Sequence, residues 1–304
     1  MSNWELTKRR IWRNKELYLI ILPVLVYYIL FHYKPMYGLI IAFQDYSPRR
    51  GIWGSDWVGL QNFKDFFGGI YFWRLLRNTL SISLVTLVVG FPAPIILALL
   101  VNELRSKLFS RITQTITYMP HFVSMVVLCA MIREFVAEDG FITQFLVKFF
   151  GYDGKNLLSR GAYFTPIYAI SNIWQGVGWG SIVYLAALTG IDMELYEAAR
   201  VDGAGRWKQT IHITIPSIAP TIIVMLIMRM GQIMSVGHEK IILLYNEGIY
   251  DKADVISTYV YRMGIVNRQY SFSAAVGMFN SVVNFILVIA ANQISKKVSE
   301  TSLW

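Results

Sequence analysis

The chain has 304 residues, of which 55% are hydrophobic and only 15% are charged, and its formal net charge is +9 at pH 7. So apolar a composition excludes an ordinary soluble domain and predicts an integral membrane protein. The basic residues stand beside apolar runs rather than in one patch with interleaved aromatic side chains, which argues against a nucleic-acid partner and favours anionic membrane lipid. Because Cys129 is the only cysteine, an internal disulfide is excluded as well.

The first predicted element is a membrane helix that follows a basic segment. Residues 1–16 carry five Lys and Arg side chains, and the apolar run 17–31 continues through Tyr33 without a small-residue cleavage site. This pattern predicts a retained anchor rather than a signal peptide. Because the first span usually dominates orientation, the segment 1–16 is expected in the cytoplasm. Residues 17–77 are then the first membrane helix and an external segment with short interfacial helices.

Five further apolar runs predict the rest of the membrane-spanning structure, since about 20 apolar residues suffice to cross a bilayer. Pro92 and Pro94 are expected to kink the first of these helices. The mixed segments 133–160 and 238–268 are expected to be external loops, and Lys296 and Lys297 to hold the tail 295–304 in the cytoplasm. The sequence thus predicts an all-α integral membrane protein with six transmembrane helices, both termini in the cytoplasm, and a five-helix core over 78–294. The five runs are 78–101, 112–132, 161–191, 211–235 and 270–294.

A polar loop at about residues 190–216 separates two of the apolar runs and is longer than a simple reversal of the chain needs. Asp192 is expected to cap a helix, Glu194 lies in its first turn, and Gly203 can supply a left-handed residue that ends it. The loop is therefore predicted to hold a short helix, a bend, and a second helix that leads into the next span. Its small side chains would let the surface of another protein approach the backbone closely.

Several positions of this loop carry specific residue types. From the residues alone, an ordinary loop whose small residues only permit a tight turn stays open as an alternative. The pattern resembles the EAA loop of bacterial ABC-importer permeases, in the carbohydrate branch of the LplB type, and the resemblance covers nearly the whole chain. Thr210 departs from the family, which commonly has an aromatic residue there, and Ile215 replaces the usual Leu. The matching residues are Glu197-Ala198-Ala199, Asp202-Gly203-Ala204, Trp207, Ile213 and Pro216.

The resemblance implies the type I ABC-importer permease fold, also called MetI-like, in the bacterial cytoplasmic (inner) membrane. It implies that the chain forms half of a translocation channel, as a heterodimer with a second, homologous permease. It further implies two ATPase subunits and an extracytoplasmic solute-binding protein as partners. The implied cargo is a complex sugar, oligosaccharide or polysaccharide fragment, while a non-sugar solute such as a polyamine or phosphate stays open, because the loop says little about cargo. The implied ATPase-coupling residues are Glu197, Ala198, Ala199, Asp202, Gly203, Ala204, Trp207 and Pro216.

The chain lacks the motifs of an energy source or an enzyme. The nearest approach to a phosphate-binding loop, residues 151–156, has the wrong spacing and lacks the hydroxyl that binds magnesium. ATP and Mg are therefore expected on the partner ATPase subunits, with no cofactor in this chain. The four His residues are scattered and no catalytic arrangement stands out, so neither a metal site nor catalysis is expected. Every Asp and Glu falls outside the uncharged cores of the spans, which argues against a secondary transporter.

Polar residues within the apolar runs are the candidates for a solute path, because they are costly in hydrocarbon and tend to face a cavity or another helix. Amide and aromatic side chains suit a neutral or hydroxyl-rich solute, although hydrogen bonds between helices and anchoring at the membrane interface are alternatives that stay open. If Arg229 lines the path, an acidic sugar is favoured. Gly176, Gly178 and Gly180 are interpreted as positions where helices pack closely. The path candidates are Asn172, Gln175, Trp179, Arg229, Gln232, Asn280 and Asn284.

Overall fold

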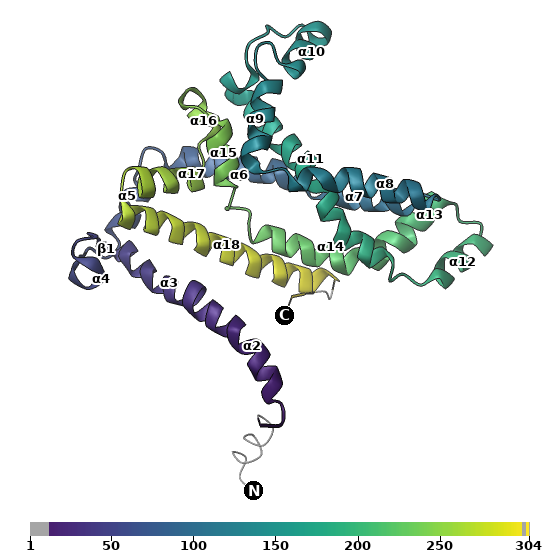
Figure 1. Ribbon diagram of the computed structural model, residues 1–304, viewed down its shortest axis with the longest axis horizontal. Coiled ribbons are helices and arrows are strands. Elements are labelled where there is room, and N and C mark those ends of the chain that lie inside the picture. The colour runs from purple at the N-terminus through teal and green to yellow at the C-terminus, as the bar shows by residue number, and fades with distance from the viewer. Residues whose placement is uncertain (1–11, 300–301, 304) are drawn as a thin grey trace. The chain divides into compact units, whose positions relative to one another are not determined.

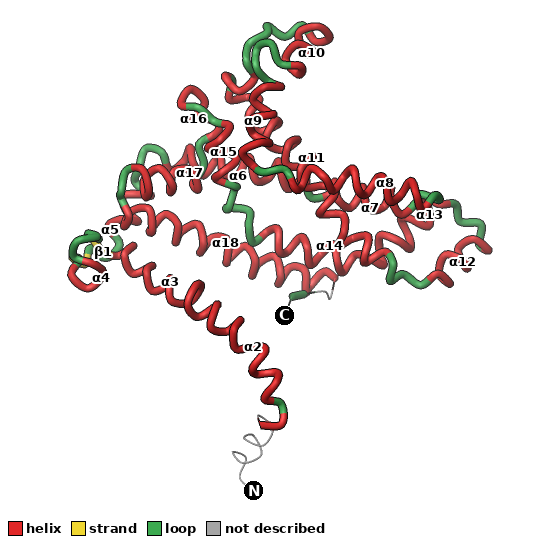
Figure 2. The backbone as a smooth tube through the Cα atoms, viewed as in Figure 1, coloured by secondary structure: helices red, strands yellow, loops and turns green. Residues whose placement is uncertain are grey.

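The computed structural model describes residues 12–299 and 302–303. Most of the predicted cytoplasmic segment 1–16, and residues 300, 301 and 304 of the tail, lie outside the described residues. Helices account for nearly all regular structure in the described chain, as the red tube of Figure 2 shows, and the strands are confined to one short pair. The predicted all-α fold is confirmed.

The chain forms two compact units. The first comprises Met1–Phe67 and Met263–Met278, and the second comprises Gly68–Arg262 and Phe279–Trp304, so the last helix contributes residues to both. The helices and strands of the first unit up to Phe67 are α2 (Lys15–Tyr28), a π-helical turn (Ile29–Tyr33), α3 (Lys34–Met36), a 3₁₀ turn (Tyr37–Phe43), β1 (Gln44–Asp45), α4 (Gly51–Gly54), β2 (Asp56–Trp57) and α5 (Gln61–Phe67).

The second unit holds the remaining helices, which Figure 1 labels along the chain. The first group is α6 (Phe72–Gly90), α7 (Pro92–Asn102), α8 (Lys107–Tyr118), a 3₁₀ turn (Met119–Phe122), α9 (Met125–Phe135), α10 (Phe141–Phe150), a 3₁₀ turn (Leu157–Ser159) and α11 (Gly161–Leu188). The second group is α12 (Met193–Val201), α13 (Arg206–Gln209), a π-helical turn (Thr210–Thr214), α14 (Ile215–Met230), α15 (His238–Leu244), a 3₁₀ turn (Glu247–Ile249), α16 (Tyr250–Ala253) and α17 (Ile256–Tyr261). A π-helical turn (Arg262–Val266) and α18 (Tyr270–Ser299) follow.

In the first unit, the helical run that begins with α2 ends at a small antiparallel pair, with Gln44 opposite Trp57. The side-chain amide of Asn62 donates to the carbonyl oxygens of Ala42 (2.9 Å) and Gln44 (3.2 Å), which fixes α5 beside β1. The ring of Phe43 stacks on Trp57, with centroids 5.8 Å apart. By contrast, α2 buries none of its side chains, so its apolar surface is left uncovered by the described chain.

Within the described residues, four helices are long and apolar enough to cross a membrane: Lys15–Phe43, Phe72–Asn102, Arg206–Met230 and Tyr270–Lys297. Two bent pairs bring the number to six when each is counted as one span. The first pair, Lys107–Phe122 with Met125–Phe135, bends by 97°, and the second, Gly161–Leu188 with Met193–Val201, bends by 74°. Six spans is also the number that the sequence predicts.

The apolar run 112–132, predicted as one membrane span, is not a single continuous helix. It breaks after the 3₁₀ turn that contains Pro120, and Val123 has extended backbone. The side chain of Ser124 then accepts a hydrogen bond from the Val127 N–H and starts α9. Proline cannot donate in a helix and a serine cap opens a new one, so these two residues explain the 97° bend. The change of helix expected at Pro92 is present, because α6 ends at Gly90 and α7 begins at Pro92.

The segment 238–268, expected as a loop, is largely helical and contributes to the main apolar core of the second unit. Periodicity did not reveal these helices because each is too short to show a helical repeat. The core also draws side chains from α6, α9 and α11, and a smaller cluster joins α7, α11 and α14 through Ala98, Tyr184, Leu188 and Ile218. The fully or nearly fully buried core residues of the segment are Ile241, Leu244, Ile249, Ala253 and Val255.

Asp254 is completely buried and ties this segment to the start of α6. Its carboxylate receives two hydrogen bonds from Arg262, at 2.7 and 3.1 Å, and an ion pair from Arg74 at 3.4 Å. The Thr258 hydroxyl donates to the same carboxylate at 2.8 Å, and the Asn78 amide donates to the Asp254 carbonyl oxygen at 2.9 Å. A buried carboxylate with this many donors is well compensated.

We expect Asp254→Asn to destabilise the protein by about 3 kcal/mol, because it leaves two largely buried guanidinium groups without their anion. The measurement is the melting temperature of the purified protein in detergent. Asp251→Asn, which changes an exposed carboxylate three residues earlier, is the matched control and should leave the melting temperature unchanged. Equal melting temperatures for the two variants would contradict this account of the Asp254 cluster.

Candidate functional site

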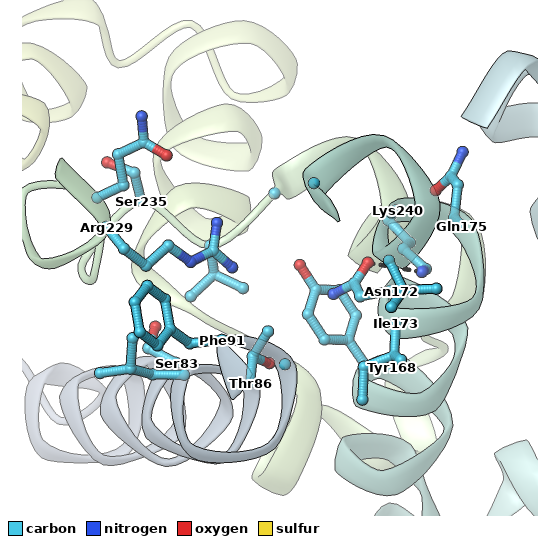
Figure 3. Close-up of a pocket in the computed structure, with 18 of the residues that line it drawn as sticks. Ser83, Thr86, Phe91, Tyr168, Asn172, Ile173, Gln175, Arg229, Ser235 and Lys240 are labelled. Atoms are coloured by element: carbon cyan, nitrogen blue, oxygen red, sulfur yellow. Dashed lines mark hydrogen bonds between the residues drawn. The ribbon is translucent and has the colours of Figure 1, made fainter. Parts of the chain in front are cut away.

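A cavity of about 740 Å³ lies within the second unit, lined by residues of α6, α7, α11, α14 and the stretch 232–240. Figure 3 shows side chains from these elements converging on it. The lining combines hydroxyl, amide and charged groups with the rings of Phe91, Tyr168 and Tyr184. Its polar residues are Ser83, Thr86, His121, Tyr168, Asn172, Gln175, Tyr184, Arg229, Gln232, Ser235, His238, Glu239 and Lys240.

One wall of the cavity is the non-helical segment 231–237, which we call the break. The sequence predicts a helix through Ser235, but α14 ends at Met230, which corrects that boundary. At Gly231 a Cβ atom would overlap the side chain of Val288 on α18. Beyond Gly231, turn-type backbone hydrogen bonds and hydrogen bonds from side chains replace the backbone hydrogen bonds of a helix.

Three side chains from other elements hold the break in place. The Ser83 hydroxyl donates to the Ile233 carbonyl oxygen, and the Ser257 hydroxyl donates to the Val236 carbonyl oxygen at 2.7 Å. The Asn284 carbonyl oxygen accepts from the Met234 N–H at 2.9 Å, and its amide donates to the Ser235 hydroxyl at 2.8 Å. Backbone groups that leave a helix need such partners. The break is therefore a defined wall.

Lys240 is a buried cation in the cavity lining, and only 2% of its surface is exposed. Its ammonium donates to the side-chain amide oxygen of Asn172 (Oδ1) at 2.7 Å and lies 5.3 Å from the centre of the Tyr168 ring. Burial lowers the pKa of Lys240 to about 8. Sequence reasoning did not select this residue, because it placed the whole segment outside the apolar runs. The only signal is the apolar stretch Ile241 to Leu244 that follows it directly.

The structure brings four of the seven predicted path residues to the cavity: Asn172, Gln175, Arg229 and Gln232. The other three lie elsewhere. Trp179 stacks on the ring of His121, with centroids 4.6 Å apart. Asn284 holds the break, and Asn280 is half-buried with a side-chain oxygen that has no partner among the described residues.

Gly176, Gly178 and Gly180, the three glycines in the middle of α11, have different surroundings. A Cβ atom at Gly178 would overlap the backbone carbonyl of Thr117, and one at Gly180 would lie 3.1 Å from Pro94. Close packing, as predicted, is confirmed at these two positions. Gly176 lines the cavity instead, and a Cβ atom there would meet nothing within 4 Å.

The loop 190–216 has the predicted helix–bend–helix form. The Asp192 carboxylate accepts from the Glu194 N–H at 3.0 Å at the start of α12. After α12, Gly203 adopts the left-handed conformation with φ of +76°, and the Ala204 N–H donates to the Ala199 carbonyl oxygen at 2.8 Å. The chain then runs through α13 and the π-helical turn into α14. Gly203 therefore ends the helix, as the sequence predicts.

Two contacts fix this loop, and most of its predicted coupling residues are exposed. The hydroxyls of Tyr196 and Thr214 lie 2.9 Å apart, and Arg206 lies 3.5 Å from Glu103, which follows α7. Val201 and Trp207 are 90% and 77% exposed, which leaves apolar surface on the loop without cover from the described chain. Among the predicted coupling residues, Ala199 and Ala204 are half-buried, and Glu197, Ala198, Asp202, Gly203, Trp207 and Pro216 are exposed.

The chain resembles a known protein family and individual known proteins over most of its length. The family described as "Binding-protein-dependent transport system inner membrane component" matches residues 90–300. Protein LplB of Bacillus subtilis is 46% identical over 293 residues, which cover 96% of this chain and 92% of the relative. The polygalacturonan/rhamnogalacturonan transport system permease protein YteP of the same species is 44% identical over 96% of this chain and 91% of its own length.

Two solved structures resemble the chain. A chain in the crystal structure of the bacterial alginate ABC transporter in complex with alginate pentasaccharide-bound periplasmic protein has a TM-score of 0.88 and 42% identity. The match covers 97% of this chain and 99% of that one. A chain of the MetNI methionine ABC transporter has a TM-score of 0.51 at 14% identity, over 75% of this chain and 94% of its own, and so shares the fold alone.

We expect Gly178→Ala to lower the melting temperature, because the methyl group would force α11 away from the Thr117 backbone. A shift of several degrees corresponds to the 1–3 kcal/mol, approximately, that overpacking typically costs. Gly176→Ala is the matched control two residues earlier on the same helix. It faces open space, so it should melt like the unmodified protein or slightly higher. The opposite ranking would contradict the assignment of Gly178 to packing and Gly176 to the cavity.

Proposed function

Since the chain belongs to the binding-protein-dependent transport system inner membrane components, we propose that it forms half of the membrane channel of an ABC importer for a complex saccharide. The observation that carries the proposal is the cavity, which lies among membrane-type helices and is lined by hydroxyl, amide and aromatic groups. Such groups both donate and accept hydrogen bonds and cover the apolar faces of sugar rings. The names of the similar proteins support a saccharide over a polyamine or phosphate.

The partners follow from the same proposal. The alginate structure, which includes a periplasmic binding protein, supports a solute-binding protein as the source of cargo. We further propose a second, homologous permease as the other half of the channel, in a heterodimer. Because α2 exposes apolar side chains along its whole length, we propose that it contacts membrane lipid and the second permease. ATP and Mg would be bound by two ATPase subunits, so this chain contributes no catalytic group and no cofactor site.

The loop 190–216 is the proposed contact with an ATPase subunit. It presents exposed charge at Glu197 and Asp202 beside exposed apolar surface at Val201 and Trp207. Through α13 and the π-helical turn it is continuous with α14, whose end borders the break. Movement of the loop by ATP-driven closure of the ATPase subunits would therefore reach the cavity. This role puts the loop and both termini in the cytoplasm, and puts the segments 133–160 and 238–268 on the outer face.

We expect Gly203→Val to abolish coupling, with at least a tenfold loss of ATPase activity stimulated by the loaded binding protein. A branched side chain is strained at a φ of +76°, so the bend after α12 would change. Glu197→Lys, which reverses an exposed charge on the same surface, should act in the same direction. The measurement is ATP hydrolysis by the purified complex in lipid vesicles.

Two controls separate coupling from folding. Gly203→Asn should keep activity, because Asn tolerates the left-handed conformation. Gly205→Val should keep it too, because Gly205 has a φ of −67° and open space around it. Failure of Gly203→Val to insert into the membrane, or full activity in that variant, would contradict the assignment.

We expect Gly176→Leu to reduce saccharide uptake about tenfold or more while the complex still assembles. The new side chain would extend into the cavity without meeting another group at its first atom. Gly176→Ala, which adds only one methyl group, should have a much smaller effect. The measurement is uptake of labelled saccharide by vesicles with equal amounts of assembled complex. Normal uptake in Gly176→Leu would show that cargo does not pass through this cavity.

A further inference from the structure

Two cations line the cavity without an anionic partner. Elsewhere in the second unit, Arg74 and Arg262 both pair with the carboxylate of Asp254. Among the described residues, no carboxylate lies within 4.0 Å of the charged group of Arg229 or Lys240. Among the described residues that line the cavity, Glu239 carries the carboxylate. It is exposed and forms no ion pair with Arg229 or Lys240. The cavity therefore presents uncompensated positive charge.

Lys240 is the more costly of the two, because its side chain is buried. An ammonium has three donors, and among the described residues only the Asn172 oxygen, at 2.7 Å, accepts from it. The Tyr168 ring face adds a favourable contact, but it carries no full charge. A buried cation is retained at this cost where a counter-ion completes its surroundings. The space that it borders is the cavity.

Uncharged groups between the two cations would suit the rest of a ligand. In the view of Figure 3, Tyr168 and Thr86 lie between Arg229 on one side and Lys240 on the other. Thr86 is 7% exposed, and its hydroxyl oxygen has no partner among the described residues. The lining thus combines a hydroxyl without a partner with aromatic rings, which provide hydrogen bonding and a flat apolar surface, and sugar rings use both together.

We propose that this chain holds an anion-binding site in which Lys240 binds one carboxylate and Arg229 another carboxylate of an acidic oligosaccharide, such as a uronic-acid oligomer. Asn172 is then a positioning residue, because it orients the Lys240 ammonium. The inference rests on the proposed function and adds that the cargo is anionic and that this half of the channel contacts it. A volume of about 740 Å³ exceeds what a single inorganic anion needs and accommodates linked sugar rings.

The test uses the complete importer in lipid vesicles, with a labelled galacturonate tetramer carried by its binding protein. We expect Lys240→Met to lower the maximal uptake rate of this probe about tenfold or more, because a charge-assisted hydrogen bond is lost. Lys240→Arg, which keeps the charge, should retain most of the rate. Lys155→Met, which removes an exposed lysine outside the cavity, is the control and should have no effect. The concentration of loaded binding protein at half-maximal rate should stay the same in all variants.

The outcomes separate the two proposals. Unchanged uptake in Lys240→Met would overturn the anion site, and so would an equal loss in Lys240→Met and Lys240→Arg, which would indicate a packing role. A wild-type importer that takes up a neutral oligosaccharide but not the galacturonate tetramer would overturn the anion site and leave the proposed function intact. Uptake of the labelled tetramer that inorganic phosphate inhibits as strongly as unlabelled galacturonate does would also overturn the anion site, because the two cations would then bind a small anion. Failure to import any saccharide would instead remove the proposed function.

Discussion

Between Gly231 and Gly237 the backbone leaves the helical hydrogen-bond pattern, so its polar groups need partners that the protein itself supplies. Hydrocarbon supplies none, and irregular backbone at membrane depth is tolerated where protein covers it or where it lines a cavity. Both conditions apply here, since Ser83, Ser257 and Asn284 bond the break from three elements and its other side borders the cavity. The cavity depends on this wall, and the wall depends on those three side chains.

Charge is treated in opposite ways at two buried sites of the second unit. Around Asp254 the anion is surrounded by guanidinium and hydroxyl donors, which makes the cluster a fixed joint between α6 and the segment 250–262. At Lys240 the described residues offer the charge only an amide oxygen and a ring face. The first arrangement is complete without a ligand, and the second is not. This difference distinguishes a structural ion cluster from a binding site, although both are buried and polar.

Local features of the structure could be predicted from the sequence, and non-local ones could not. The apolar runs identify the long helices, and the cap at Asp192 and the left-handed turn at Gly203 follow from residue type at fixed spacing. The path residues were selected for polarity alone, which cannot say which face of a helix meets a cavity. Position on a helix does not decide it either: Gln175 lines the cavity, whereas Trp179, one turn further along α11, stacks on His121. Lys240 was missed because its burial depends on α9, α11 and the break, which are distant in sequence.

The proposed function requires ATP-driven import of saccharide through this chain, with the loop 190–216 as the proposed contact with an ATPase subunit. The most direct measurement is saccharide uptake together with ATP hydrolysis in vesicles that hold the chain and its copurifying subunits, with saccharide-loaded binding protein outside. The account predicts that both activities rise when the loaded binding protein is added and that both need ATP inside. Uptake that follows an ion gradient without ATP, in vesicles from which no ATPase subunit copurifies, would contradict it.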